Sequence, residues 1–438
     1  MKQLFKYVLI FIATFAILAG SLVATVAAIP RSAIEENLQE SASYLSEESG
    51  FVQIVPSKFS TQIHRYADSI LLTIEYFLDS EQPLASSMWA HYYRNTNQAA
   101  AINLLLTVNG MEEANDTYLR YWHGSLVPVR ILLLIGDIRL MYAVHIALLA
   151  LLAAALIIML WRHRYRAEVI GLLMALIAVN AGLVPLCLEY TWTFLIMLIA
   201  SIIAVRMAWK GRFDHLGALF LVTGMVTAFL DFLTTETITV LIPLLLALRV
   251  GFKEQGEDFR PWKLTIRCCA LWLIGFLGRW AMKWVTASVA LGENVMPYVT
   301  EHVQERLGGA LDEPPSLAGY LWGAVARNIR MLFPLDFGGL PVVCLVIVQI
   351  IGIVLLVTFG CVRRREVNWP RVALYGALGL IPYIRYLALR NHSYLHYFFT
   401  YRAQMTTILA LCFIVLECVE VGRSAGKTRA VHVHRRKK

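Results

Sequence analysis

The chain has 438 residues, of which 58% are hydrophobic and only 16% are charged, and its formal net charge is +9. A water-soluble protein of this length needs far more polar surface, so the composition excludes an ordinary soluble globular protein. The basic residues lie in short clusters between apolar runs, which is typical of cytoplasmic loops rather than of a nucleic-acid-binding surface. We therefore expect an integral membrane protein with no nucleic-acid partner.

Apolar runs of about 20 residues recur along the chain, and each is long enough to cross a hydrocarbon core of about 30 Å as a helix. Only helices and closed barrels satisfy the backbone inside lipid, and these runs are too long for barrel strands. The predicted spans cover residues 7–29, 138–161, 168–188, 191–208, 215–233, 236–250, 266–288, 339–361, 371–389 and 402–420. The sequence thus predicts an all-α, polytopic integral membrane protein with about ten transmembrane helices and a large extracytoplasmic loop after the first.

The distribution of Lys and Arg predicts the orientation of these spans. Every short loop on one side is basic when both termini are placed in the cytoplasm, and a multi-pass plasma-membrane protein is expected. The first apolar run is longer than the core of a cleaved signal peptide, so a retained signal-anchor is favoured over cleavage after Ala28. The expected regions are a first transmembrane helix at 1–29, an extracytoplasmic loop with interfacial helices at 30–137, transmembrane helices 2–7 at 138–288, a second extracytoplasmic loop at 289–338, transmembrane helices 8–10 at 339–422, and a basic cytoplasmic tail at 423–438.

Ionisable side chains near the spans concentrate at the end of the bundle that is predicted to face outside. A charge within a span costs about 2.5–3.5 kcal/mol, so it usually has a partner or a function. Asp231 and Glu236 bracket the connection between the fifth and sixth spans, and they can balance Arg279 or Lys283 in the seventh. A structural ion-pair network would explain these residues. We favour a functional cavity that opens to the outer face.

The segment after the ninth predicted span combines histidine, arginine and aromatic residues. His392 and His396 are four residues apart, so they share a face of a helix and can bind phosphate oxygens or exchange protons. Arg390 and Arg402 add guanidinium groups, which suit a phosphate or pyrophosphate. An aromatic belt at the membrane interface is the alternative. The two histidines lack an evident third ligand nearby, so a metal site is not predicted.

Two pieces of the first polar segment are further candidates. Residues 62–72 read as an amphipathic helix with Asp68 among apolar residues, and this carboxylate can accept a proton from an attacking hydroxyl unless it is a solvated or capping residue. The sequence Arg120-Tyr121-Trp122-His123-Gly124 combines aromatic rings with Arg120 and His123. Such a set suits sugar stacking and phosphate contact, and an interfacial anchor is the equal alternative.

The layout resembles the GT-C-type superfamily of polytopic membrane glycosyltransferases, which have a first span, a large outer loop with an acidic residue, and many further spans. Locally, the stretches 120–124, 231–235 and 391–402 resemble a group of uncharacterised bacterial polytopic membrane proteins of similar layout. The GT-C resemblance implies a polyprenyl-phosphate-linked sugar as donor at the outer leaflet and an acidic residue of the first loop as base, for which Asp68 is the candidate. That loop lacks a clear Asp-x-Asp or Glu-x-Asp pair, so no metal or other cofactor is predicted.

We therefore expect a glycosyltransferase that moves a sugar from a polyprenyl-phosphate carrier to a glycan or other cell-envelope acceptor, with membrane lipid around it. A ligase or polymerase of lipid-linked glycans is one alternative. A transporter or flippase is the other, because Pro185, Pro243 and Pro382 can break helices. The predicted catalytic residues are Asp68, His392 and His396, and the predicted substrate-binding residues are Arg120, His123, Asp231, Arg279, Arg390 and Arg402.

Overall fold

The computed structural model describes residues 2–47, 49–56, 59–255, 259–308, 316–332, 362–364 and 366–421. Helices make up most of these residues. The strands within the described ranges form three two-stranded antiparallel ribbons, in which β1 (Phe51–Gln53) pairs with β2 (Gln62–His64), β3 (His91–Tyr92) with β4 (Asp116–Thr117), and β5 (Val362–Arg364) with β6 (Val419–Val421). The prediction of an all-α fold is confirmed.

Six helical segments among the described residues are long and apolar enough to cross a membrane. They are α1 (Lys2–Ala28), α7 (Ile138–Arg162), α9 (Leu188–Trp209), α10 (Phe213–Leu230), α12 (Pro261–Leu291), and the run Tyr397–Cys418 that comprises α18 (Tyr397–Thr400), η5 (Tyr401–Gln404) and α19 (Met405–Cys418). These helices support a membrane-embedded protein.

Three further predicted spans coincide with α8 (Arg166–Ala178), α11 (Ile238–Glu254) and α16 (Trp369–Ala388). Helix α8 has only 13 residues, which is short for a complete crossing, and α11 has 17, which is at the lower end of the spanning range. The 3₁₀ helix η3 (Ala181–Leu186) follows α8 and contains Pro185. The predicted span 339–361 lies outside the described residues, so a total of ten spans stays a prediction.

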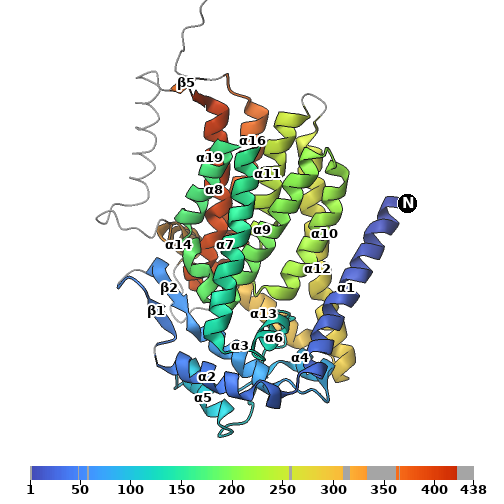
Figure 1. Ribbon diagram of the computed structural model, residues 1–438, viewed down its shortest axis with the longest axis vertical. Helices are drawn as coiled ribbons and strands as arrows, with labels where there is room; N and C mark the ends of the chain where they lie inside the picture. The colour runs from blue at the N-terminus through green and yellow to red at the C-terminus, as the bar shows by residue number, and fades with distance from the viewer. Residues whose placement is uncertain are drawn as a thin grey trace, which may run out of the picture.

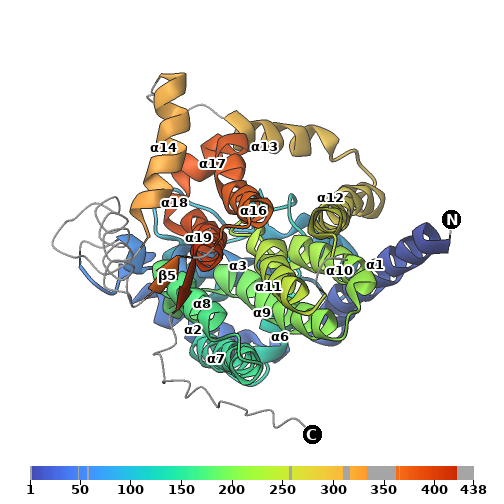
Figure 2. The same cartoon turned by 90° about the horizontal axis from the view of Figure 1, so that it is seen from above.

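The long helices run side by side as a bundle, with α1 at its edge (Figures 1 and 2). Helix α11 is buried along most of its length, whereas most of α1 is exposed. Helices α10 and α12 approach each other closely because each carries a glycine at the contact: a Cβ on Gly224 would lie 2.1 Å from the carbonyl oxygen of Trp272, and one on Gly275 would lie 2.2 Å from that of Leu221. Small residues bring membrane helices together in this way.

A layer of short helices covers one end of the bundle (Figure 1). It contains η1 (Arg31–Ala33), α2 (Glu35–Ser46), η2 (Phe59–Thr61), α3 (Arg65–Phe77), α4 (Pro83–Trp89), α5 (Ala100–Val108) and α6 (Leu126–Leu132). After α12, the chain adds α13 (Met296–Gly308), α14 (Leu317–Arg330) and, beyond α16, α17 (Arg390–Leu395). We call the end of the bundle that carries these short helices the covered end.

A fully buried ion pair fixes the covered end to the first helix. Arg130 donates to the Glu75 carboxylate at 2.8 Å, and neither side chain is exposed. Arg130 also donates to the carbonyl oxygens of Glu75 and Ile29, which lies just beyond α1. The pair therefore joins α3, α6 and the end of α1, and it gives the layer of short helices a defined position on the bundle.

Candidate functional site

A chamber of about 270 Å³ lies at the covered end, between α3, the start of α9 and the segment that follows α16. Its polar residues come from four separate parts of the sequence: His64, Glu189, Arg306, His392 and His396. Aromatic rings form much of the remaining wall, from Phe51, Tyr66, Tyr118, Tyr121, Phe232, Phe398 and Phe399. We call this cavity the histidine chamber.

One side of the chamber carries a histidine–carboxylate pair. Nδ1 of His64 lies 3.0 Å from Oε2 of Glu189, and both side chains are mostly buried. The His64 ring is stacked between aromatic neighbours, with Tyr190 at 5.8 Å and Phe51 at 5.0 Å between ring centroids. Because an ionised carboxylate can only accept, Nδ1 of His64 donates to Glu189 and orients it. This pair can take up a proton from a hydroxyl in the chamber.

The chamber wall also carries two histidines that are kept neutral by burial and by nearby cations. Nη1 of Arg306 donates to Nε2 of His396 at 3.1 Å, so the proton of a neutral His396 is on Nδ1. Burial and the Arg306 charge lower the pKa of His396 to about 3. Burial and Arg385 likewise hold the pKa of His392 well below its ordinary value. At neutral pH both rings are therefore hydrogen-bond donors to an anion rather than cations.

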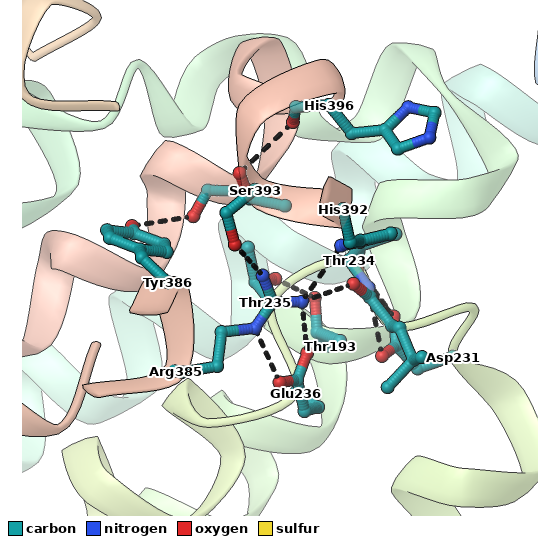
Figure 3. A network of polar contacts seen from close by, with 12 residues as sticks. Thr193, Asp231, Thr234, Thr235, Glu236, Arg385, Tyr386, His392, Ser393 and His396 are labelled. Carbon is teal, nitrogen blue, oxygen red and sulfur yellow. Dashed lines mark hydrogen bonds and ion pairs between the residues drawn. The ribbon is translucent and has the colours of Figure 1, made fainter. Parts of the chain in front are cut away.

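Arg385 organises the wall behind these histidines, as Figure 3 shows. Its guanidinium binds the Glu236 carboxylate at 2.8 Å and 3.2 Å and donates to the carbonyl oxygen of Leu233 at 2.7 Å. On its other side it reaches the hydroxyl of Ser393 at 3.3 Å and Nδ1 of His392 at 3.5 Å. Glu236 thus neutralises Arg385, and Arg385 orients the turn that carries the two histidines.

A second cavity of about 450 Å³ adjoins the chamber and is largely apolar. Trp272, Phe276, Trp280 and Trp284 recur at every fourth position of α12 and therefore share one face of that helix. Apolar residues of α13, among them Val299 and Val303, form the other side. The exposed residues Leu273 and Leu277 place this cavity at the apolar surface of the bundle. We call it the aromatic groove.

The polar end of the aromatic groove meets the histidine chamber. Tyr121 and Arg306 line both cavities, and Arg120, His302 and Arg385 line the groove. Nη1 of Arg120 lies 3.4 Å from Nδ1 of His302, and its guanidinium lies over Tyr118 at 4.2 Å.

Arg120 and Arg306 remain available for an anion. Within the described ranges, neither forms an ion pair with a carboxylate, and the Nε–H of each has no hydrogen-bond partner. Two guanidinium groups without a direct carboxylate partner, at the end of an apolar groove, suit a phosphate attached to a long apolar chain.

Asp68 lies beside the chamber but not on its wall. Its oxygens accept from the Tyr142 hydroxyl at 2.5 Å and from the backbone N–H of Leu188 at 2.8 Å, and the residue is fully buried. Burial raises the pKa of Asp68 to about 6. The carboxylate therefore caps the N-terminus of α9, next to Glu189, and its predicted role as base stays a prediction.

Three other predicted residues pack within the covered end rather than on the wall of either cavity. Arg279 lies 3.7 Å from the centroid of Trp122 and donates to the carbonyl oxygen of Phe15. Nε2 of His123 lies 2.7 Å from the carbonyl oxygen of Tyr118, and burial lowers the pKa of His123 to about 3. Asp231 accepts from the hydroxyl and backbone N–H of Thr234 (Figure 3).

The remaining two predicted residues also lie away from the cavity walls. Arg402 is buried, with its guanidinium 4.5 Å from the Tyr190 ring centroid. Arg390 lies 5.9 Å from the Tyr320 ring centroid. The structure thus brings His392 and His396 into the chamber and Arg120 to its edge, while the others stabilise the surrounding packing. Their predicted part in binding stays a prediction.

His64, Glu189 and Arg306 are not among the site residues predicted from the sequence. Glu189 stands at the outer end of the third predicted span, and His64 lies within the predicted amphipathic segment 62–72, so both positions carried a signal. Arg306 lies in the second polar segment, where sequence reasoning gave no reason to single it out. What links these three residues is the fold, because 125 residues separate His64 from Glu189 and 90 separate Arg306 from His396.

His64 and Glu189 of the chamber wall, together with the buried Cys187 behind it, form a candidate set of metal ligands. Ligand atoms of His64, Cys187 and Glu189 all lie within 4.8 Å of one another. A nitrogen, a sulfur and a carboxylate oxygen are the ligand types that Zn²⁺ accepts. The Cys187 thiol is buried and lies 3.7 Å from the carbonyl oxygen of His64.

The chain matches no family model, no curated protein and no solved structure. The likeness to GT-C enzymes therefore stands on the sequence features given above.

Proposed function

We propose that the protein is a membrane glycosyltransferase that moves a sugar from a polyprenyl-phosphate carrier to a cell-envelope acceptor. The observation that carries this proposal is the junction of the two cavities: an apolar groove ends at two arginines that have no direct carboxylate partner among the described residues, beside a chamber with a histidine–carboxylate pair. A long isoprenoid chain suits the aromatic groove, its phosphate suits Arg120 and Arg306, and its sugar suits the histidine chamber.

The proposed reaction is a displacement at the anomeric carbon of the sugar. The oxygen of an acceptor hydroxyl forms the new glycosidic bond, and the bond between the anomeric carbon and the phosphate oxygen breaks. The polyprenyl phosphate leaves with the bonding electrons, and Arg120 and Arg306 stabilise its negative charge. The hydroxyl proton goes to Glu189, which His64 orients at 3.0 Å.

Two residues predicted as catalytic take specific places in this proposal. Nδ1–H of His396 donates to the phosphate, because Arg306 occupies Nε2 at 3.1 Å. Asp68 is a positioning residue, because its hydrogen bond to Leu188 N holds the first turn of α9, in which Glu189 lies.

The proposal adopts the topology that the basic loops predict. Ten spans with both termini in the cytoplasm place the covered end outside the plasma membrane, where a flipped lipid-linked donor and an envelope acceptor meet. The short helices of residues 30–137 then form the extracytoplasmic loop.

A binding experiment on the full-length protein in nanodiscs tests the central observation. We expect Arg306→Gln to weaken binding of polyprenyl phosphate by roughly 10- to 150-fold, the effect of about 1.5–3 kcal/mol for a lost charged hydrogen bond. The matched control is Arg31→Gln, because Arg31 is exposed on η1 and lines neither cavity. Equal affinity for polyprenyl phosphate and the uncharged polyprenol would contradict the proposal.

Transfer is then measured with a radiolabelled polyprenyl-phosphate hexose. Release of polyprenyl phosphate together with a labelled product supports the transferase. Movement of the donor across a vesicle membrane without cleavage would instead support a flippase, and use of preassembled chains only would support a ligase.

A further inference from the structure

A polar groove adjoins the histidine chamber. It consists of two overlapping cavities of about 270 Å³ and 450 Å³, which share the segment Tyr93-Arg94-Asn95-Thr96. Tyr66 and Ile70 of α3 line both the polar groove and the histidine chamber. The histidine chamber therefore adjoins both the aromatic groove and the polar groove, and α3 lies at the boundary between the chamber and the polar groove.

The lining of the polar groove is rich in groups that both donate and accept hydrogen bonds. Carboxamides come from Asn95, Gln98 and Asn103, hydroxyls from Thr73, Thr96 and Tyr92, and ring faces from Tyr66 and Tyr93. A carboxamide offers an N–H₂ donor beside a carbonyl acceptor, which matches the alternating needs of sugar hydroxyls. Tyrosine faces offer apolar contact to the C–H side of a sugar ring.

The charges in this groove are balanced. Arg94 lies 3.6 Å from Asp116, whose carboxylate also accepts from the Tyr92 hydroxyl at 2.9 Å. Arg94 and Asp116 are both part of the lining. This balance disfavours an anionic ligand such as a nucleotide or a phosphate, and it distinguishes the polar groove from the arginine-rich end of the aromatic groove.

The loop that forms the groove is fixed by its own hydrogen bonds. Asn115 accepts from the backbone N–H of Arg94 at 2.8 Å and donates to the Arg94 carbonyl oxygen at 3.1 Å. Nδ2 of Asn103 donates to the carbonyl oxygen of Asn95 at 3.2 Å. Asn103 is only 6% exposed, and its Oδ1 has no partner among the residues that the structure describes. A ligand donor that forms a hydrogen bond to a buried, unsatisfied acceptor on a cavity wall contributes favourably to the binding free energy.

We propose that this groove is the acceptor subsite and that it takes a neutral, polyhydroxylated saccharide. The saccharide lies along the segment 93–98, and its terminal hydroxyl passes Tyr66 to reach Glu189 in the histidine chamber. This inference rests on the proposed transferase function and names its acceptor class: a glycan rather than a peptide or an anionic polymer.

The test measures saccharide binding without catalysis, by saturation-transfer NMR on the full-length protein in nanodiscs. The probes are neutral trisaccharides (maltotriose, mannotriose and chitotriose), and an uncharged tripeptide serves as the comparison ligand. We expect at least one trisaccharide to bind and Asn103→Leu to weaken its binding roughly three- to tenfold, since the substitution removes the acceptor Oδ1 and the bond from Nδ2 to Asn95. Gln98→Ala is the second variant, because Gln98 is exposed and its loss leaves the packing intact.

Asn109→Ala is the matched control, because Asn109 is an exposed carboxamide at the C-terminal end of α5 that does not line the groove. Binding of the tripeptide alone, or unchanged trisaccharide binding in both groove variants, would overturn the subsite. Polyprenyl-phosphate binding is measured on the same samples. Its absence together with intact trisaccharide binding would refute the donor part of the proposed function and leave the saccharide subsite standing.

A glycolipid dispersed in the nanodisc distinguishes the two sources of the glycan. The same groove variants should weaken both ligands if the saccharide moiety is what is recognised. An effect of the variants on the glycolipid that exceeds their effect on the free trisaccharide would place the acceptor in the membrane.

Discussion

The contact between α10 and α12 gives the sharpest prediction about what holds this bundle together. A Cβ on Gly224 would lie 2.1 Å from the Trp272 carbonyl oxygen and 3.0 Å from the Phe276 nitrogen. Ordinary contact begins at 3.4 Å, so Gly224→Ala requires the two backbones to separate by about 1.3 Å. The obstructing atoms belong to the backbone of a helix, so no side chain can rotate away.

Overpacking of this kind costs about 1–3 kcal/mol, and it opposes the gain of about 0.5–1 kcal/mol that alanine brings to a helix. We expect Gly224→Ala to lose about 1 kcal/mol of unfolding free energy, measured by denaturant titration in micelles with circular dichroism. Gly376→Ala is the control, because a Cβ there meets nothing within 4 Å. That variant should be as stable as the parent or slightly more stable.

The same substitution connects packing to ligand binding. Trp272 and Phe276 supply both the atoms that Gly224 meets and part of the aromatic groove. Gly224→Ala should therefore weaken polyprenyl-phosphate binding, whereas Gly376→Ala should not. Adding Gly275→Ala to Gly224→Ala should cost less than the sum of the single effects, because one separation relieves both contacts. Parent-like stability of Gly224→Ala would refute the close approach of these helices.

Three more predictions concern the covered end. Glu189→Gln should lower the rate of sugar transfer roughly 10²- to 10⁴-fold, because the acceptor of the hydroxyl proton is removed. The affinity for polyprenyl phosphate should stay unchanged. Undiminished turnover would exclude Glu189 as the base. The pKa of Asp68 rises from 3.8 to about 6 on folding, so the folded state binds a proton more tightly than the unfolded state. About 3 kcal/mol of stability is therefore lost as the pH rises through that interval. The unfolding free energies of Asp68→Asn at pH 4 and pH 7 should differ less than those of the parent, and an equal difference would contradict this. Glu75→Gln should lower the unfolding free energy by about 3–5 kcal/mol, because it leaves Arg130 buried without a counter-ion. Combining Glu75→Gln with Arg130→Met should recover most of this loss. No recovery would show that the contacts of Arg130 with backbone carbonyl oxygens matter more than its charge.

The apolar runs of the sequence determined where the long helices lie. The run predicted at 138–161 is α7, Ile138–Arg162, and the run at 266–288 lies within α12, Pro261–Leu291. This agreement arises because the length and hydropathy of a run are properties of neighbouring residues. The recurrence of aromatic residues at every fourth position of α12 is local in the same way, although its role as a groove wall was not evident.

The tertiary structure alone decided which polar residues share a cavity. Asp68 and Glu189 are both acids at the covered end, yet Asp68 is satisfied by Tyr142 and Leu188, while Glu189 lines the chamber with His64. Neither Arg279 nor Arg306 forms an ion pair with a carboxylate among the described residues. Aromatic rings nevertheless enclose Arg279, whereas Arg306 lines both cavities. The hydropathy and length of a segment determine whether it can cross the lipid as a helix. The direction of a side chain at the end of that segment depends on helices distant in sequence that pack against it, and no local pattern carries that information.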